Sequence, residues 1–180
     1  MTERNTRTRV LHAAGRVVLQ QGVRGLTLEA VAREAGVSKG GLLYHFASKD
    51  ELLAGMVGEF VALIEARMAE STQEDTAPGR WTRAYLEASV VDREGDDPTD
   101  RLATAMLAAG ASNTALLEPL YARQEDWQRE QRADGIDPTT AAVVRLAADG
   151  LWMNDLFGIQ VLSDAEREAT IDRLRRLTRE

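Results

Sequence analysis

The chain has 180 residues, a net charge of −7 and 44% hydrophobic residues, so it can bury a core and is too apolar to be disordered. It has no cysteine, which excludes disulfides and thiolate metal sites. The charged opening MTERNTRTRV lacks the apolar segment of a secretory signal, and no apolar run approaches the roughly 18–20 residues of a membrane span. We therefore expect a cytoplasmic protein with no membrane partner.

Charge is divided unevenly along the chain. Residues 1–50 carry eight Lys or Arg and four Asp or Glu, a net charge of +4, which leaves residues 51–180 with −11. A basic segment joined to an acidic one orients a molecule on a polyanion, because the acidic part is repelled where the basic part is attracted. Alone, such a split more often indicates a solvated surface.

The first 46 residues are predicted to form three helices. The first covers Thr6–Gln21 and ends at Gly22. In the run Thr27–Phe46, apolar residues at helical spacing define a second helix, which Thr27 caps and Gly36 ends in a left-handed conformation. A tight turn then leads into a third helix. Two short helices joined in this way commonly place the second of them in the major groove of DNA.

This region resembles the helix-turn-helix of the TetR family of bacterial repressors over about residues 7–60. The matching positions are Gly22, Thr27, Val31, Ala32, Ala35, Gly36, Val37 and Ser38, then Gly41, Leu43, Tyr44, His45, Phe46, Ser48, Lys49 and Leu52. The resemblance implies a bacterial repressor with an all-helical C-terminal part. The phrase Leu146–Asp155, LAADGLWMND, is similar to the small multidrug-responsive members of the family.

The third helix is predicted to carry most of the DNA contacts. Ser38 caps it, and Leu42, Leu43 and Phe46 face the core. The adjacent Gly40 and Gly41 each cost helix propensity of about 1 kcal/mol relative to alanine. We therefore expect the backbone to approach DNA closely there, although a loose first turn is the alternative.

The expected contacts continue along the chain. For Tyr44 and His45, the resemblance favours phosphate contact over half-buried packing. Lys49 lies at a helix N-terminus, where free N–H groups bind phosphate. The expected DNA-binding residues are Thr27, Ser38, Lys39, Gly40, Gly41, Tyr44, His45 and Lys49.

The rest of the chain is also predicted to be helical. Ser48 and Glu51 form a capping box that opens a long helix to about Glu70, and a polar connector follows. The further expected helices are Trp81–Asp92, Thr99–Ala111, Ala115–Arg132, Asp137–Gly158 and Asp164–Thr178. We predict an all-α fold of about nine helices. Its domains are a helix-turn-helix DNA-binding domain at 1–48, a connecting helix at 49–70 and a ligand-binding and dimerisation domain at 71–180.

A single helix-turn-helix reads only a few base pairs, so we expect a homodimer on an inverted-repeat operator in double-stranded DNA. The last two helices present apolar stripes that are candidates for an intersubunit four-helix bundle. The candidate dimer residues are Val144, Ala148, Leu151, Ile171, Leu174 and Leu177. Without the family resemblance, use of both stripes within the core of one subunit would be an equal alternative.

Aromatic and methionine side chains gather beyond the connector and can line a pocket for flat, apolar or cationic molecules. The candidate pocket residues are Phe60, Trp81, Tyr85, Met106, Trp127, Asp149, Trp152 and Asp155. Either aspartate can instead face solvent or a partner subunit, with the aromatic residues in the core. The identity of the small-molecule effector does not follow from the sequence.

An enzyme is disfavoured. The only histidines, His12 and His45, lie in the predicted DNA-binding domain, and the chain has no P-loop, dinucleotide fingerprint, Gly-x-Ser-x-Gly motif or metal-ligand cluster. We therefore expect neither catalysis nor a cofactor. Two functions stay open: a repressor that a small molecule releases from its operator, and a ligand-independent DNA-binding protein whose C-terminal part only dimerises.

Overall fold

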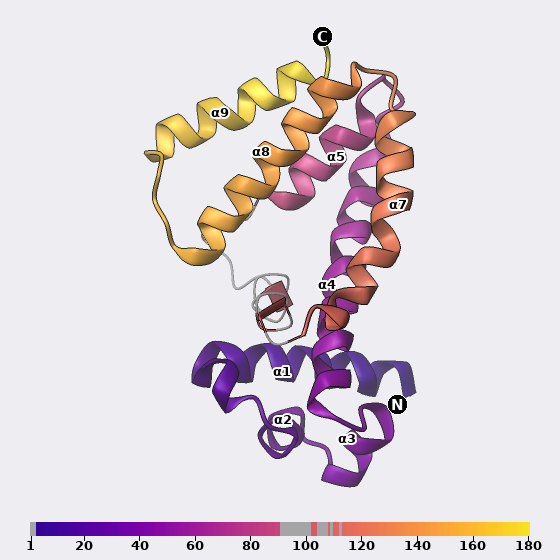
Figure 1. The fold of residues 1–180 in the computed structure, drawn as a ribbon, viewed down its shortest axis with the longest axis vertical. Helices are drawn as coiled ribbons and strands as arrows, with labels where there is room; N and C mark the ends of the chain where they lie inside the picture. Colours follow the sequence, from indigo (N-terminus) through magenta and orange to yellow (C-terminus); the bar gives the residue numbers. More distant parts are fainter. Residues whose placement is uncertain (1–2, 91–101, 104–107, 109, 112) are drawn as a thin grey trace. The chain divides into compact units, whose positions relative to one another are not determined.

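The computed structural model describes residues 3–90, 102–103, 108, 110–111 and 113–180. In these ranges eight α-helices and one short 3-10 helix make up an all-α fold (Figure 1), which confirms the predicted class. The expected helix Thr99–Ala111 lies largely outside the described residues. The chain divides into two compact units. The first is Met1–Ala62 with Asp96–Ala122, and the second is Leu63–Gly95 with Arg123–Glu180.

The first unit begins with three helices, α1 (Glu3–Gly25), α2 (Leu28–Ala35) and α3 (Lys39–His45), and α2 packs against both of the others (Figure 1). Gly22 interrupts α1 with φ 69° and ψ 173°, which confirms the predicted helix stop. Leu42 is fully buried whereas Leu43 is 38% exposed, which corrects the expectation that both face the core. Neighbouring residues on a helix point about 100° apart, so a short helix on a surface buries only one of them.

The predicted caps hold both short helices in place. Thr27 Oγ1 accepts a hydrogen bond from Ala30 N at 3.1 Å, and Gly36 ends α2 with φ 64° and ψ 37°. Ser38 Oγ accepts from Gly41 N at 3.0 Å at the start of α3. Each cap satisfies backbone groups that the helix leaves free. The turn geometry therefore follows from residues no more than three positions apart.

The long helix α4 (Lys49–Thr72) begins in the first unit and ends in the second, since the boundary between the units lies at residues 62 and 63. Ser48 Oγ accepts from Glu51 N at 3.0 Å, as the predicted cap requires. The second bond of the predicted capping box differs, because Glu51 Oε2 accepts from Ala47 N at 2.9 Å, one residue before the Ser48 cap.

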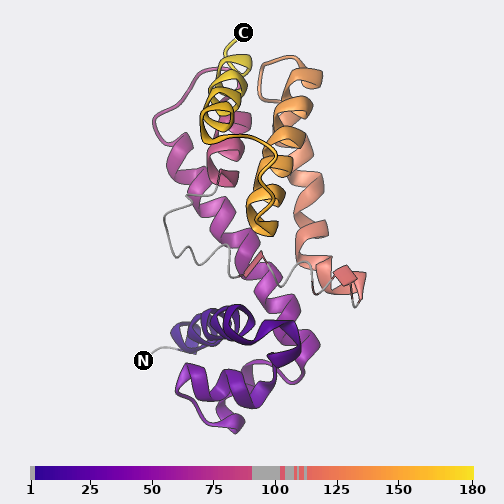
Figure 2. The ribbon, with the colours of Figure 1, turned by 90° about the vertical axis from the view of Figure 1, so that its left-hand side faces the viewer.

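The second unit contains α5 (Arg80–Ser89), α8 (Pro138–Phe157), α9 (Asp164–Leu177) and most of α7 (Glu118–Arg132), which follows the 3-10 helix η1 (Thr114–Leu117). Here α5 packs against α8 and α9, and α8 packs against α9 (Figures 1 and 2). Ser163 and Glu166 form the predicted capping box at α9. Asp137 caps α8, which Gly158 ends with φ 64°.

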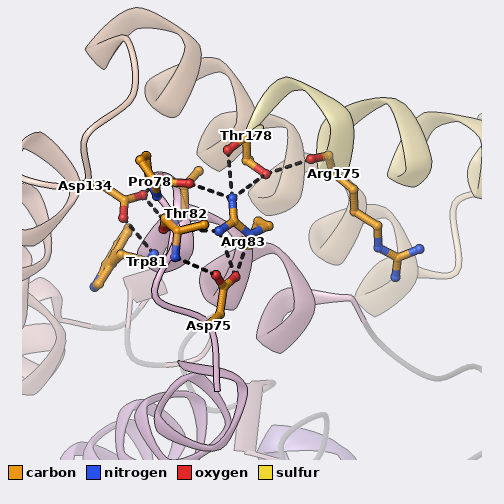
Figure 3. A network of polar contacts seen from close by, with 9 residues as sticks. Asp75, Pro78, Trp81, Thr82, Arg83, Asp134, Arg175 and Thr178 are labelled. Carbon is orange, nitrogen blue, oxygen red and sulfur yellow. Dashed lines mark hydrogen bonds and ion pairs between the residues drawn. The ribbon is translucent and has the colours of Figure 1, made fainter. Parts of the chain in front are cut away.

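Two buried charged residues fix the start of α5 (Figure 3). The Asp134 carboxylate accepts hydrogen bonds from Trp81 N at 2.8 Å, Thr82 N at 2.9 Å and Thr82 Oγ1 at 2.7 Å. It therefore caps a helix from more than 50 residues away. Arg83 lies beside it and joins Asp75 to the carbonyl oxygens of Pro78, Ala77 and Thr178.

Candidate DNA-binding surface and effector site

The leading end of α3 presents backbone and small side chains to solvent. Ser38, Lys39, Gly40 and Gly41 are all exposed. A Cβ added at Gly40 would meet no atom within 4 Å, and Gly40 is not among the glycines with positive φ. The fold itself therefore has no need of glycine there, although glycine weakens a helix. No contact that the structure describes accounts for a glycine at this position.

Lys39 is already paired within the protein. Its Nζ lies 2.6 Å from Glu29 Oε1, and both side chains are more than half exposed. The hydrogen bond from Lys39 holds the pKa of Glu29 below its ordinary value, so this carboxylate is ionised at neutral pH. Any phosphate that contacts Lys39 has to compete with Glu29. Sequence reasoning did not single out Glu29, although an acidic residue near the N-terminus of a helix is common.

Tyr44 and His45 lie at the other end of α3. Tyr44 is 75% exposed, which is unusual for so large an aromatic side chain, while His45 is half-buried. Their rings meet edge to face with centroids 5.2 Å apart. The phenol is thus held away from the core on the same helix that carries Lys39.

Thr27 and Lys49, the two outlying candidates, have structural contacts of their own. Thr27 is exposed and caps α2 through its oxygen, which leaves its hydroxyl hydrogen available to another acceptor. Lys49 Nζ donates to Val23 O at 3.3 Å and is half-buried. Since an ammonium has three N–H donors, this bond still leaves two for another acceptor.

Three of the predicted pocket residues meet in one cluster of the second unit. The rings of Trp81 and Tyr85 stack at 5.5 Å, and the ring of Trp127 meets that of Tyr85 edge to face at 5.9 Å. All three are buried. A groove of about 350 Å³ borders this cluster and is lined by Met68, the two tryptophans and charged side chains of α4 and α7.

A cation and a carboxylate complete the cluster. The Arg145 Cζ lies 5.1 Å from the Tyr85 ring, 5.7 Å from that of Trp127 and 6.0 Å from that of Trp81. The Tyr85 hydroxyl donates to Asp149 Oδ1 at 2.7 Å. Burial raises the pKa of the Asp149 carboxyl, and burial together with the Asp149 charge raises that of Tyr85, so the phenol remains the donor. Arg145 was missed from the sequence, although its spacing of four residues from Asp149 was a signal.

The remaining pocket candidates lie in other surroundings. Phe60 is buried in the first unit, and Met106 lies outside the described residues. Trp152 is half-buried on α8. Asp155 pairs with Arg167 of α9 at 2.5 Å, so this carboxylate is already neutralised and joins two helices. Among the residues that the structure describes, no group of three His, Asp or Glu side chains could hold a metal ion.

The predicted dimer residues are used inside the chain. Val144 and Ala148 are fully buried, Leu151, Ile171 and Leu174 are at most 8% exposed, and Leu177 is half-buried. This favours the alternative in which both stripes belong to the core of one subunit. The exposed apolar residues of α8 are instead Val143, Leu146, Met153 and Phe157, none of which was among the six candidates.

Two family models match the chain. "Bacterial regulatory proteins, tetR family" covers residues 10–56, and "Tetracyclin repressor-like, C-terminal domain" covers residues 79–179. The chain is also 28% identical over 130 residues to the HTH-type transcriptional regulator LmrA of Bacillus subtilis. That alignment covers 71% of this chain and 69% of LmrA.

Solved structures agree with these matches. A transcriptional regulator from Rhodococcus sp. Rha1 aligns over 96% of this chain and 95% of its own with a TM-score of 0.74 and 24% identity, which supports the fold. The multidrug binding protein EbrR, solved with malachite green, aligns over 96% and 97% with a TM-score of 0.59 and 30% identity. In the described ranges, no helix is both long and apolar enough to cross a membrane. Since the C-terminal model alone covers more than half of the chain, the protein belongs to the TetR family, a family of DNA-binding transcriptional regulators and not of enzymes.

Proposed function

We propose that two copies of this chain form a repressor on an inverted-repeat operator and that an aromatic, cationic small molecule releases it. The observation that carries the DNA-binding part is the leading end of α3. Gly40 is exposed there, and no neighbouring atom in the protein explains why this position is a glycine. Close approach of the groove to the backbone supplies that reason, with Lys39 beside it as a phosphate or base contact.

Tyr44, His45, Thr27 and Lys49 extend the proposed contact surface. A phenol, a threonine hydroxyl and an ammonium all donate hydrogen bonds to phosphate oxygens, which fix the register of a protein on the duplex. The net charge of +4 on residues 1–50 adds an attraction that does not depend on sequence. Lys39→Ala and Tyr44→Ala should each lose operator binding without loss of helicity.

A second copy is the proposed occupant of the exposed face of α8. We define the α8 outer stripe as Val143, Leu146, Gly150, Met153 and Phe157, which fall within an arc of about 80° on a helix of 3.6 residues per turn. The buried side of α8 faces roughly the opposite way. Leu146 is 70% exposed, and a Cβ at Gly150 would meet nothing within 4 Å. An apolar stripe of this kind around a glycine supports close helix–helix packing between subunits.

The aromatic cluster of α5, α7 and α8 is the proposed effector site. Three rings, a polarizable methionine and several carboxylates are a lining that suits planar cations. EbrR, which is 30% identical over nearly the whole chain, has been solved with malachite green and with ethidium, and both compounds are aromatic cations. This likeness supports the proposed effector class.

Release from DNA requires coupling between the effector site and α3. We propose that α4 transmits it, because this helix runs without interruption from the first unit into the second. The effector must then prefer a conformation that is incompetent for DNA, and operator must weaken effector binding by the same factor. For most coupled sites that factor lies at about 5–150-fold.

The test begins with selection of bound DNA from a random pool, followed by anisotropy titration of the selected duplex. Ethidium and malachite green are then titrated with and without that duplex. Weaker binding of the cation in the presence of operator supports the repressor mechanism. Specific operator binding with equal cation affinity in both titrations would favour the alternative, a ligand-independent DNA-binding protein whose second unit only dimerises.

A further inference from the structure

The Arg145 guanidinium lies among three aromatic rings. We define the Arg145 cage as the rings of Trp81, Tyr85 and Trp127, whose centroids all lie 5.1–6.0 Å from the Arg145 Cζ. Cations are attracted to ring faces at distances up to about 6 Å, so all three rings contribute. Two of them come from α5 and one from α7, while the cation comes from α8. One charge from a third helix thus fills a site that two other helices form.

We propose that Arg145 is an intramolecular occupant of an aromatic-cation site, and that a planar organic cation binds there by displacing the Arg145 guanidinium. This inference rests on the proposed function in one respect, namely that the chain responds to a small molecule. It adds the location of the site, the residue that closes it and the charge of the ligand that opens it.

Arg145 has fewer hydrogen-bond partners than the buried Arg83, which makes its displacement the easier of the two. Its Nη2 donates a hydrogen bond to Gln124 Oε1 at 2.7 Å, and its charge acts on Tyr85 and on the nearby Asp149 carboxylate. By contrast, Arg83 is bonded to Asp75 and to three backbone carbonyl groups. The Arg145 side chain is also half-buried, so its long stem can carry the charge into water. Hydration of the released guanidinium offsets much of what it loses in the cage.

Displacement of Arg145 leaves a site that favours another positive charge. Asp149 is bonded to the Tyr85 hydroxyl of the cage, and it would lose the nearby positive charge of Arg145. The groove beside Trp81 and Trp127 offers about 350 Å³, with Met68 as an adaptable wall. An incoming ring system can stack on the tryptophans while its charge replaces that of Arg145.

The groove disfavours an anionic ligand. Two carboxylates, Glu65 and Glu130, line it with one cation, Arg123, and Arg123 is already bonded to Glu65 Oε1 at 2.6 Å, which also accepts from Trp127 Nε1 at 3.1 Å. A ligand carboxylate in this groove would be repelled by these two carboxylates. The Arg145 guanidinium also lies within 6.0 Å of three ring centroids and has one nitrogen bonded to Gln124, which leaves it poorly placed to bind an anion.

The test compares the wild type with Arg145→Ala, Arg145→Gln and a control, Arg173→Ala. The control removes an exposed arginine of α9 that pairs with Glu180. Binding of ethidium, of malachite green and of uncharged phenanthridine is measured by titration. Removal of a competing cation–π partner should tighten binding of the two cations by about tenfold, with little change for phenanthridine or for Arg173→Ala. Arg145→Gln keeps a hydrogen-bonding group without the charge, so it replaces the alanine variant if that variant does not fold.

A second measurement does not need the dyes. Propylguanidinium at millimolar concentration should raise the Tm of Arg145→Ala above that of the untreated variant, with no such rise for the wild type or for Arg173→Ala. Two results would overturn the inference. One is that both Arg145 variants bind the cations no more tightly than the wild type does. The other is that the wild type binds an anionic dye and the Arg145 variants do not. If the Arg145 variants change cation binding but bound cation does not change operator affinity, the Arg145 cage is supported and the release mechanism is refuted. If the same cation concentration releases the wild type and all variants from the operator, the release mechanism is supported and the Arg145 cage is refuted.

Discussion

Lys39 Nζ lies 2.6 Å from Glu29 Oε1, so the cation at the leading end of α3 has a counter-ion within its own unit. The two residues come from adjacent helices, since Glu29 lies in the first turn of α2 and Lys39 opens α3. Both side chains are well exposed, so the pair adds little to stability in water. Its consequence is for DNA, because Glu29 competes with phosphate for Lys39 and places a negative charge beside the proposed contact surface.

Glu29→Gln should therefore strengthen operator binding. Loss of the carboxylate frees the Lys39 ammonium and removes repulsion from the phosphate backbone, which should raise affinity up to about fivefold, the scale of an exposed ion pair. Anisotropy titrations between about 50 and 200 mM salt would measure the gain, which should shrink as salt screens the charges.

Glu34→Gln is the matched control for this change. Glu34 lies on the same helix, pairs with Arg16 at 2.6 Å and carries the same charge. Its removal alters the net charge of residues 1–50 by the same amount but leaves Lys39 paired with Glu29. Equal gains in the two variants would show that the effect is one of net charge only and that Glu29 has no special relation to Lys39.

Gly40→Ala should separate stability from function. A Cβ at Gly40 meets open space, so alanine should stabilise the free protein by about 0.5–1 kcal/mol through its higher helix propensity. The same methyl group would stand between the backbone and a DNA groove and should weaken operator binding. Chemical denaturation and anisotropy measure the two effects on one sample. Gly58→Ala on α4, where a Cβ meets only Pro119 at 3.7 Å, should be well tolerated and leave DNA binding unchanged.

The helix caps were predictable because they depend on local chemistry. Thr27, Gly36, Ser38, Ser163 and the Pro138 start of α8 all act on backbone groups within a few residues. Asp134 and Arg83 escaped prediction because their partners lie up to 95 residues away, and nothing in the sequence marks those pairings.

The faces of α8 show a different limit of sequence reasoning. This helix has apolar residues on two opposite sides, one through Val144 and Ala148 and one through Val143 and Leu146. With apolar residues on both sides, the sequence of this helix does not say which side the subunit buries. The dimer residues predicted from the sequence for α8 lie on its buried side. In the same way the sequence indicated the aromatic residues of the candidate site but not that Arg145 fills the space between them.

Leu146→Glu should disrupt assembly without unfolding the chain. Leu146 is 70% exposed, so a carboxylate there is hydrated in the monomer and is desolvated only in a subunit interface. We expect a helical monomer with weak operator binding, detected by light scattering and circular dichroism. Leu174→Glu is the contrasting variant, because Leu174 is 5% exposed and a buried charge should unfold the second unit. A Leu146→Glu dimer with normal operator affinity would exclude the α8 outer stripe as the interface.

Arg83→Ala should destabilise the second unit far more than Arg175→Ala. Arg83 is buried, and its loss leaves Asp75 and the carbonyl of Thr178 without their partner, at a cost of about 2–3 kcal/mol. Arg175 pairs with Glu87 on the surface, where the cost should stay below about 1 kcal/mol. Urea unfolding of the variants and the wild type at one protein concentration gives both differences.

The pH dependence of the Arg83 effect tests its cause. The Arg83 hydrogen bond holds the pKa of Asp75 below its ordinary value, so folding favours the ionised carboxylate. This contribution is present above the unfolded pKa of about 3.9 and is lost as the pH falls through the lower folded pKa. The stability gap between the wild type and Arg83→Ala should therefore narrow on acidification below about pH 4. A gap that stayed constant would assign the whole effect to the bonds with backbone carbonyl groups.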